Sequence, residues 1–214
     1  MKKLIYTVHY GNYDNLWEPT FITYGWDYIV VTDNRYLKSS FWNVMYYKET
    51  LPPWLMARKV FILHNMLFSE YDLSIFIGGQ YQVVNYLDSF IRNKQGKSIY
   101  LMGHPERSCI WEELDACLYH KKISRGQHKE VKRLFTRDKI PRNYGMVQTG
   151  VMIRNHNDES LTEFTNQWYD NTKKMYRDQL SFAYTWHYNP IDYGTYDEKE
   201  LKGNFIKYLH LNGT

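Results

Sequence analysis

The segment Leu73-Ser-Ile-Phe-Ile-Gly-Gly-Gln80 decides the fold, because a short, largely apolar run stops there at two glycines. Such a run, closed by a turn signal, is typical of a buried strand over residues 73–77. The run at 28–32 has the same form and leads straight into Asp33-Asn34. Ligands in open α/β sheets bind outside the carboxyl ends of the strands. Residues 78–80 and 32–34 are therefore candidate site segments from topology alone.

The rest of the chain places strands and helices in alternation around this segment. Apolar runs predict strands at 4–8, 98–102 and 147–154, a continuation of the sheet at 81–84 and a last strand at 204–209. Helical spacing predicts helices at 54–68, 110–119 and 124–135, then one that Asp158 caps and one that begins near Arg177. This alternation predicts an α/β fold with a mainly parallel sheet and helices on both faces. A length of 214 residues, with no repeat or linker, favours a single domain over 1–214.

Composition favours a soluble, intracellular protein. No stretch approaches the roughly 20 apolar residues that cross a bilayer, and the apolar run after Met1-Lys2-Lys3 is too short for the core of a signal peptide. Cys109 and Cys117 lie in one predicted helix, about 12 Å apart, which is too far for a disulfide. We therefore expect a cytoplasmic location, in a bacterium or a phage-infected host cell.

Aromatic residues are abundant, with 21 Tyr, 10 Phe and 7 Trp, and most are expected to pack in the core. Some can instead form flat platforms for sugars or bases, because aromatic rings stack on both. The formal net charge of +4 suits a protein that handles anionic phosphates.

Seven segments, in order along nearly the whole chain, resemble one protein family. They are Tyr6-Thr-Val-His-Tyr-Gly-Asn-Tyr-Asp14, Val31-Thr-Asp-Asn34, Ala57-Arg58-Lys59 with His64, Ser74-Ile-Phe-Ile-Gly-Gly-Gln80, His104-Pro-Glu-Arg107 with Glu112-Glu113, Thr149-Gly-Val-Met-Ile-Arg-Asn-His-Asn157 and Arg177-Asp-Gln-Leu-Ser-Phe182. The set resembles a glycosyltransferase-like domain family formerly of unknown function, with bacterial, viral and plant members, the plant proteins being those of pollen and seed mucilage.

The resemblance implies a GT-A (Rossmann-like) fold and the transfer of a sugar from a nucleotide-diphosphate sugar, UDP-linked, to a hydroxyl of a surface glycan. It implies that the nucleotide lies over the end of the first strand, with Asp33 near the base or ribose. The implied nucleotide-sugar-binding residues are His9, Tyr10, Gly11, Asp33, Arg58, Lys59, Gly78, Gly79, Gln80 and Arg154. The implied catalytic residues, which reach the sugar or the acceptor, are Arg177, Asp178 and Gln179.

Gly78 departs from the pattern of the family. The family has an acidic residue at this position, within an Asp-x-Asp type of motif that holds a divalent metal against the diphosphate. Gly78-Gly79-Gln80 supplies no carboxylate, which Mg²⁺ or Mn²⁺ prefers. Many GT-A enzymes also place a metal-binding histidine near the C-terminus, where this chain has His210. Whether a metal is used stays open.

Three explanations of Gly78 remain. The protein is naturally metal-independent, or it is a weakened or non-catalytic relative that only binds sugar nucleotides, or an aspartate natural to this position has been replaced. Without a metal, basic side chains must neutralise the diphosphate, and Arg58, Lys59, Arg154 and Arg177 are available.

A basic stretch between His120 and Arg142 suggests a second surface. Its cations include Lys129, Lys132 and Arg133, with only Glu130 and Asp138 opposing them. Such a stretch is either a solvated helix and loop or an anion-binding surface for the acceptor. An acidic polysaccharide fits that surface. So does nucleic acid, in which case the protein is a phage DNA glycosyltransferase that acts on a hydroxymethylated base.

The nucleic-acid interpretation predicts that a DNA duplex binds, and that its affinity falls steeply between low and moderate salt, because bound phosphates release counterions. Fluorescence anisotropy with a labelled duplex measures this dependence. Binding that stays unchanged over that range of salt would contradict the interpretation.

Overall fold

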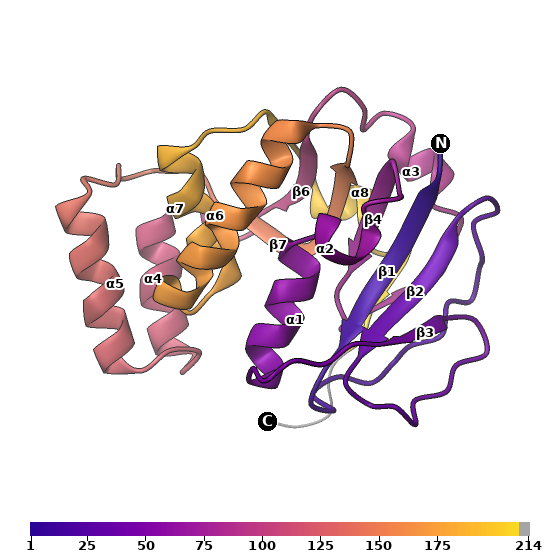
Figure 1. The fold of residues 1–214 in the computed structure, drawn as a ribbon. Helices are drawn as coiled ribbons and strands as arrows, with labels where there is room; N and C mark the ends of the chain where they lie inside the picture. The colour runs from indigo at the N-terminus through magenta and orange to yellow at the C-terminus, as the bar shows by residue number, and fades with distance from the viewer. Residues whose placement is uncertain (210–214) are drawn as a thin grey trace.

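The computed structural model describes residues 1–209, and a seven-stranded sheet with the order β3-β2-β1-β4-β7-β6-β8 forms its centre (Figure 1). The strands are β1 (Lys3–His9), β2 (Asp27–Thr32), β3 (Asn43–Tyr46), β4 (Leu73–Ile77), β6 (Ile99–Gly103), β7 (Val147–Asn155) and β8 (Tyr193–Tyr196). Six of the seven run in one direction, and β7 runs antiparallel to both neighbours, β4 and β6. The predicted mainly parallel α/β sheet is therefore confirmed.

The alternation of side chains along the strands divides the core into two layers. In β1, Leu4, Tyr6 and Val8 face one layer, while Ile5 faces the other, as the two-residue period of a strand requires. The first layer is packed against α1 (Pro53–Ile62), α2 (Asn65–Phe68), α6 (Glu159–Met175) and α7 (Asp178–Tyr188).

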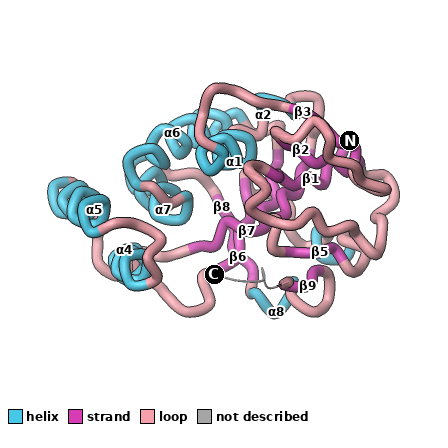
Figure 2. The backbone as a smooth tube through the Cα atoms, turned by 90° about the horizontal axis from the view of Figure 1, so that it is seen from below, coloured by secondary structure: helices cyan, strands magenta, loops and turns pink. Residues whose placement is uncertain are grey.

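The second face of the sheet is covered mainly by loops and small elements. These are α3 (Asp88–Ile91), α8 (Glu198–Leu201) and a separate two-stranded sheet made of β5 (Tyr81–Val83) and β9 (Ile206–Tyr208). Residues 81–84 and 204–209 were expected in the central sheet. They pair with each other instead, in an antiparallel sheet at the edge that Figure 2 shows from below.

A third apolar cluster lies beside the sheet, where α4 (Ile110–Tyr119) and α5 (Arg125–Arg137) pack with α7. Figure 1 shows these two helices projecting on the far side of α6 and α7 from the sheet. Ser124 and Gln127 form a capping box at the start of α5, which explains why this helix begins directly after Ser124. Cys109 and Cys117 are both free and buried in this cluster.

Two local predictions were wrong or incomplete. The helix expected over 54–68 is broken at Leu63, whose ψ of 65° is not helical, so that α1 and α2 are separate. Strands β3 and β8 were not expected, because Asn43–Tyr46 and Tyr193–Tyr196 are short and lack a run of apolar residues. In the structure, most of their side chains are exposed or half-buried. Within residues 1–209, no helix is long and apolar enough to span a bilayer.

Candidate active site

A cleft of about 1250 Å³ opens at the carboxyl edge of the parallel strands. The ends of β1 and β4 form its floor, the first turns of α1 and α7 form its walls, and the start of β7 closes it between them. Because β7 is antiparallel, its amino end rather than its carboxyl end reaches this edge. The cleft is therefore lined by Thr149 and Gly150 from β7, beside Gly78, Gly79 and Gln80 after β4.

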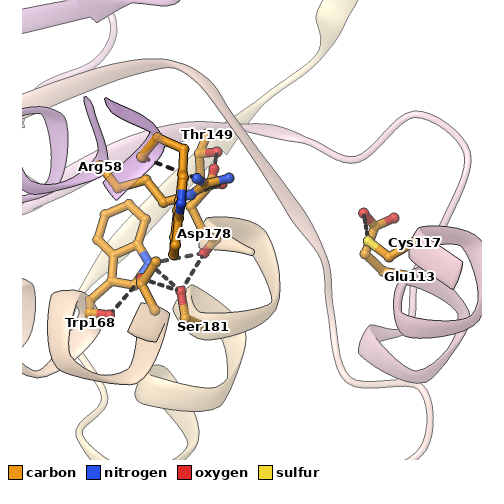
Figure 3. A network of polar contacts seen from close by, with 9 residues as sticks. Arg58, Glu113, Cys117, Thr149, Trp168, Asp178 and Ser181 are labelled. Atoms are coloured by element: carbon orange, nitrogen blue, oxygen red, sulfur yellow. Dashed lines mark hydrogen bonds and ion pairs between the residues drawn. The ribbon is translucent and has the colours of Figure 1, made fainter. Parts of the chain in front are cut away.

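Asp178 is the centre of a polar network that joins three elements around the cleft (Figure 3). Arg58 from α1 approaches its Oδ1 with Nε at 3.2 Å, and the Thr149 hydroxyl from β7 donates to its Oδ2. The main-chain carbonyl of Asp178 accepts from the Trp168 indole at 2.9 Å and from the Ser181 hydroxyl at 3.0 Å. Backbone and carboxylate are both held, so Asp178 has little freedom to move.

The local sequence explains why a carboxylate stands at this point. Arg177 is extended at the N-cap of α7, and Asp178 is the first helical residue, where the helix dipole favours a negative charge. Burial by itself would raise the pKa of Asp178, but the charges of Arg58 and Arg177 and the Thr149 hydrogen bond lower it below its usual value. Asp178 is therefore an ionised hydrogen-bond acceptor and a weak base.

The Gln80 side chain and the Gly150 carbonyl crowd the space beside position 78. The Gly78 amide donates to the Gly150 carbonyl at 2.7 Å, which ties β4 to β7. A Cβ on Gly78 would lie 2.7 Å from Gln80 Oε1 and 3.1 Å from the Gly150 carbonyl oxygen. The Gln80 amide thus occupies the space that a carboxylate at position 78 would take.

Asp14 lines the cleft but was not among the predicted site residues. A Cβ on Gly79 would lie only 2.5 Å from Asp14 Oδ2, so the carboxylate packs directly against this glycine. Burial raises the pKa of Asp14, and the opposing charge of His9 is the smaller effect. Asp14 closes the first family-like segment and follows the turn after β1, which is the signal that could have found it.

The remaining predicted nucleotide-sugar residues fall into two groups. Tyr10, Gly11 and Arg58 line the cleft. Asp33 and Lys59 lie behind its wall, since Asp33 accepts the Gly11 amide at 3.1 Å and Lys59 Nζ pairs with Glu49 at 2.5 Å.

His9 also lies behind the lining, where its Nε2 donates to the Asp14 carbonyl at 2.6 Å. It therefore fixes the loop that carries Asp14.

Arg154 is not brought to the cleft. It was expected there as a residue at a strand end, but the antiparallel direction of β7 puts that end at the opposite edge, beside the start of β4. Its side chain is fully buried, with NH1 and NH2 donating to the Tyr6 hydroxyl and the Phe61 carbonyl, each at 2.5 Å. Arg154 ties β1 to α1 within the core.

The predicted anion surface lies outside the cleft. Lys129, Lys132 and Arg133 are exposed along α5, while Gln127 and Lys122 from the same region do line the cleft. His210 lies outside the described residues. Among residues 1–209, no group of three or more His, Cys, Asp or Glu side chains could hold a metal ion.

A buried cluster fixes the loop after β6 that carries Pro105 and Glu106 to the cleft. His104 Nδ1 accepts the main-chain amides of Glu106 and Arg107 at 3.2 and 3.1 Å, and Arg107 Nε donates to buried Glu113 at 2.6 Å. Burial lowers the pKa of His104, which keeps Nδ1 free to accept. The His104–Arg107 segment of the family pattern therefore has a structural explanation.

We expect Asp178→Asn to cost more stability near neutral pH than in acid. Because the pKa of Asp178 is lowered in the folded protein, its ionised form contributes stability above the ordinary aspartate pKa of about 3.9. That contribution is lost as the pH falls through the lower folded pKa. Urea unfolding of both proteins near pH 7 and below about pH 3 measures the difference.

Asp170→Asn is the matched control for this comparison, because Asp170 pairs with Lys173 on the surface, where ion pairs contribute little. A stability difference between wild type and Asp178→Asn that is the same at both pH values would show that the Asp178 charge is not stabilising.

Comparisons with known proteins bear on the family and the fold of this chain. The family model of the TOD1/MUCI70 glycosyltransferase-like domain matches residues 41–195. Among solved structures, the apo form of the bifunctional glycosyltransferase WbbM is similar with a TM-score of 0.54 and 9% identity, over 91% of this chain and 38% of that chain. The chain thus spans well under half of WbbM, and the likeness concerns the fold alone. No curated protein matches the sequence. Because the family model covers most of the chain, this protein belongs to the TOD1/MUCI70 glycosyltransferase-like domain family.

Proposed function

We propose that the protein is a glycosyltransferase that moves a sugar from a UDP-linked or similar nucleotide-diphosphate donor to a hydroxyl group of a surface glycan. One observation carries the proposal: Arg58, Arg177 and Asp178 line the same cleft as residues 78–80, at the carboxyl edge of the sheet. Single small ligands occupy pockets of about 300 to 1,000 Å³. A cleft of about 1250 Å³ has room for a donor with part of an acceptor.

The donor nucleotide is assigned to the end of the cleft near β1. Gly11 has a φ of 65°, and the Asp33 carboxylate holds its amide, so the loop after β1 keeps a fixed shape beside the ligand. Tyr13 and Trp54 are exposed at this part of the lining and offer flat surfaces for a base or a sugar ring. The Arg58 guanidinium lies 5.2 Å from the Trp54 ring, which keeps both side chains in place.

The reaction forms a bond between the acceptor oxygen and the anomeric carbon, and breaks the bond from that carbon to the diphosphate oxygen. The electron pair of the broken bond stays on the diphosphate, and the acceptor hydroxyl gives its proton to a base. Asp178 is suited to accept hydrogen bonds from sugar hydroxyls, because its carboxylate is ionised and held by Arg58 and Thr149. We assign the base to Asp14, the lining carboxylate that has no ion-pair partner among the described residues.

A panel of nucleotide sugars tests the donor. A donor at about 100 times its Kd adds about 2.7 kcal/mol to the stability of the native state, so the matching donor should raise Tm by several degrees. Differential scanning fluorimetry with and without Mn²⁺ measures the shift, and release of the nucleotide on adding acceptor measures turnover. A panel in which no nucleotide sugar raises Tm would exclude the proposed function.

Asp14→Asn should lower turnover by a factor on the order of 10² to 10⁴, while the nucleotide still binds, because loss of a base affects the chemical step. The raised pKa of Asp14 predicts that wild-type turnover declines on the acid side, as the base becomes protonated. Steady-state kinetics over a range of pH measures both effects. Glu106→Gln is the control, since Glu106 lines the same cleft but pairs with Arg107. Equal losses in the two variants would contradict the assignment.

Two other functions are kept for specific reasons. The exposed basic face of α5 favours an anionic acceptor, which includes the hydroxymethylated DNA of the phage interpretation. Gly78 favours a non-catalytic sugar-nucleotide-binding protein, which would bind donors in the panel without turnover. Activity gained by Gly78→Asp would instead indicate an inactivated enzyme, although Gln80 must first move aside.

A further inference from the structure

Most of the negative side chains that line the cleft are paired with a cation, whereas two of the positive side chains are not paired with a carboxylate among the described residues. Three of the four lining carboxylates are paired with cations: Asp178 with Arg58, Glu198 with Lys202, and Glu106 with Arg107. Asp14 is the fourth and lies against Gly79. A divalent cation in this part of the cleft would therefore find few free carboxylate oxygens, which are the ligands that hard cations prefer.

Two lining cations, by contrast, have no carboxylate partner among the described residues. Within residues 1–209, Arg177 forms no ion pair, and its Nε is buried without a hydrogen-bond partner. Lys122, from the turn between α4 and α5, forms no ion pair with these residues either. Arg177 is the N-cap of α7, and α4, α5 and α7 pack together in the third apolar cluster, so the two cations line the cleft from neighbouring elements.

Arg177 also connects these elements to residues 78–80. The charge of Arg177 helps to lower the pKa of Asp178, whose carboxylate accepts a hydrogen bond from the Thr149 hydroxyl. Gly150, which follows Thr149 in β7, accepts the Gly78 amide at 2.7 Å. Arg58 and Arg177 together place two positive charges around the one negative charge of Asp178. A dication would be repelled by this excess of positive charge, whereas a diphosphate would be attracted.

On the basis of the proposed function, we propose that this chain binds the donor diphosphate without a divalent cation, and that Arg177 and Lys122 supply the positive charge that a metal would supply. Gln80 belongs to the same arrangement, because its neutral amide fills the space beside Gly78 where a metal-binding carboxylate would stand. Residues 1–209 therefore do not fit the metal that the Asp-x-Asp pattern of the family implies.

The assignment explains how the leaving group would be stabilised. When the bond to the anomeric carbon breaks, the electron pair and its negative charge remain on the diphosphate. Arg177 is placed to donate charge-assisted hydrogen bonds, and a guanidinium can bind two phosphate oxygens at once. Lys122 adds a point charge from the neighbouring α4–α5 turn, so the diphosphate would be held by the N-terminus of α7 and this turn.

Isothermal titration calorimetry of the full chain with UDP, and with GDP as a second nucleotide, tests the proposal in EDTA and in Mn²⁺. We expect the Kd in EDTA to lie within about threefold of the Kd in Mn²⁺. In EDTA, Arg177→Gln and Lys122→Gln should each weaken binding on the order of tenfold, because charge-assisted hydrogen bonds are lost. Uridine, which has no diphosphate, should bind equally to wild type and both variants.

Two further variants keep the result interpretable. Lys2→Gln removes the same charge at the opposite edge of the sheet, where Lys2 pairs with Glu70 on the surface and lies over the Tyr71 ring, and should leave Kd unchanged. Arg177→Lys keeps the charge and should recover part of the affinity lost in Arg177→Gln, which separates loss of charge from loss of folding.

Nucleotide binding that requires Mn²⁺ would overturn this proposal and leave the proposed function standing. Binding in EDTA that Arg177→Gln and Lys122→Gln do not weaken would also overturn it. No binding of either nucleotide with or without Mn²⁺ would exclude the proposed function and this inference with it.

Discussion

The cleft depends on the ion pair between Arg58 and Asp178. One partner comes from α1 and the other from the first turn of α7, and the Thr149 hydroxyl adds the start of β7 to the same carboxylate. These elements are far apart in the sequence, so a short side-chain contact fixes the relative position of two helices and a strand. Because the pair is largely buried, removal of one partner would leave an uncompensated charge, which is far more costly than loss of a surface pair.

Hydrogen bonds behind the cleft also fix the positions of the elements that line it. The Trp168 indole and the Ser181 hydroxyl bind the main chain of Asp178, and Trp168 itself is fully buried in α6. On the other side, His104, Arg107 and Glu113 fix the loop after β6. Helix α4 of the third cluster is thus attached to the loop after β6 by polar contacts as well as by apolar packing.

Much of the fold could be predicted from the sequence, because buried strands and amphipathic helices leave periodic apolar patterns. The strand at 73–77 and the helix at 110–119 match the structure at both ends. Strands β3 and β8 were missed since edge strands with exposed side chains have no such pattern. The pairing of 81–84 with 204–209 was also missed, because the sequence of a short strand does not reveal its partner.

The site was predictable only in part, and three separate features account for the differences. The direction of a strand within a sheet is not encoded in its own residues, so Arg154 was assigned to the cleft although antiparallel β7 presents Thr149 there instead. Asp14 was overlooked because a carboxylate in a turn also has an ordinary structural explanation. The sequence also does not show which charged side chains pair with each other. Lys59 pairs with Glu49, whereas Arg177 has no ion-pair partner in the part of the chain that the structure describes.

Gln80 has a consequence for how this chain can change over evolutionary time. Its amide lies where a side chain on Gly78 would be, so an acidic residue introduced at position 78 alone would meet steric conflict with residue 80 and with the backbone of β7. The two positions are therefore epistatic: each substitution is tolerated or rejected according to what the other residue is. In a lineage with Gly78 and Gln80, an acidic residue at position 78 would be accepted more readily after residue 80 had become smaller or had turned aside, so the order of the two changes would matter.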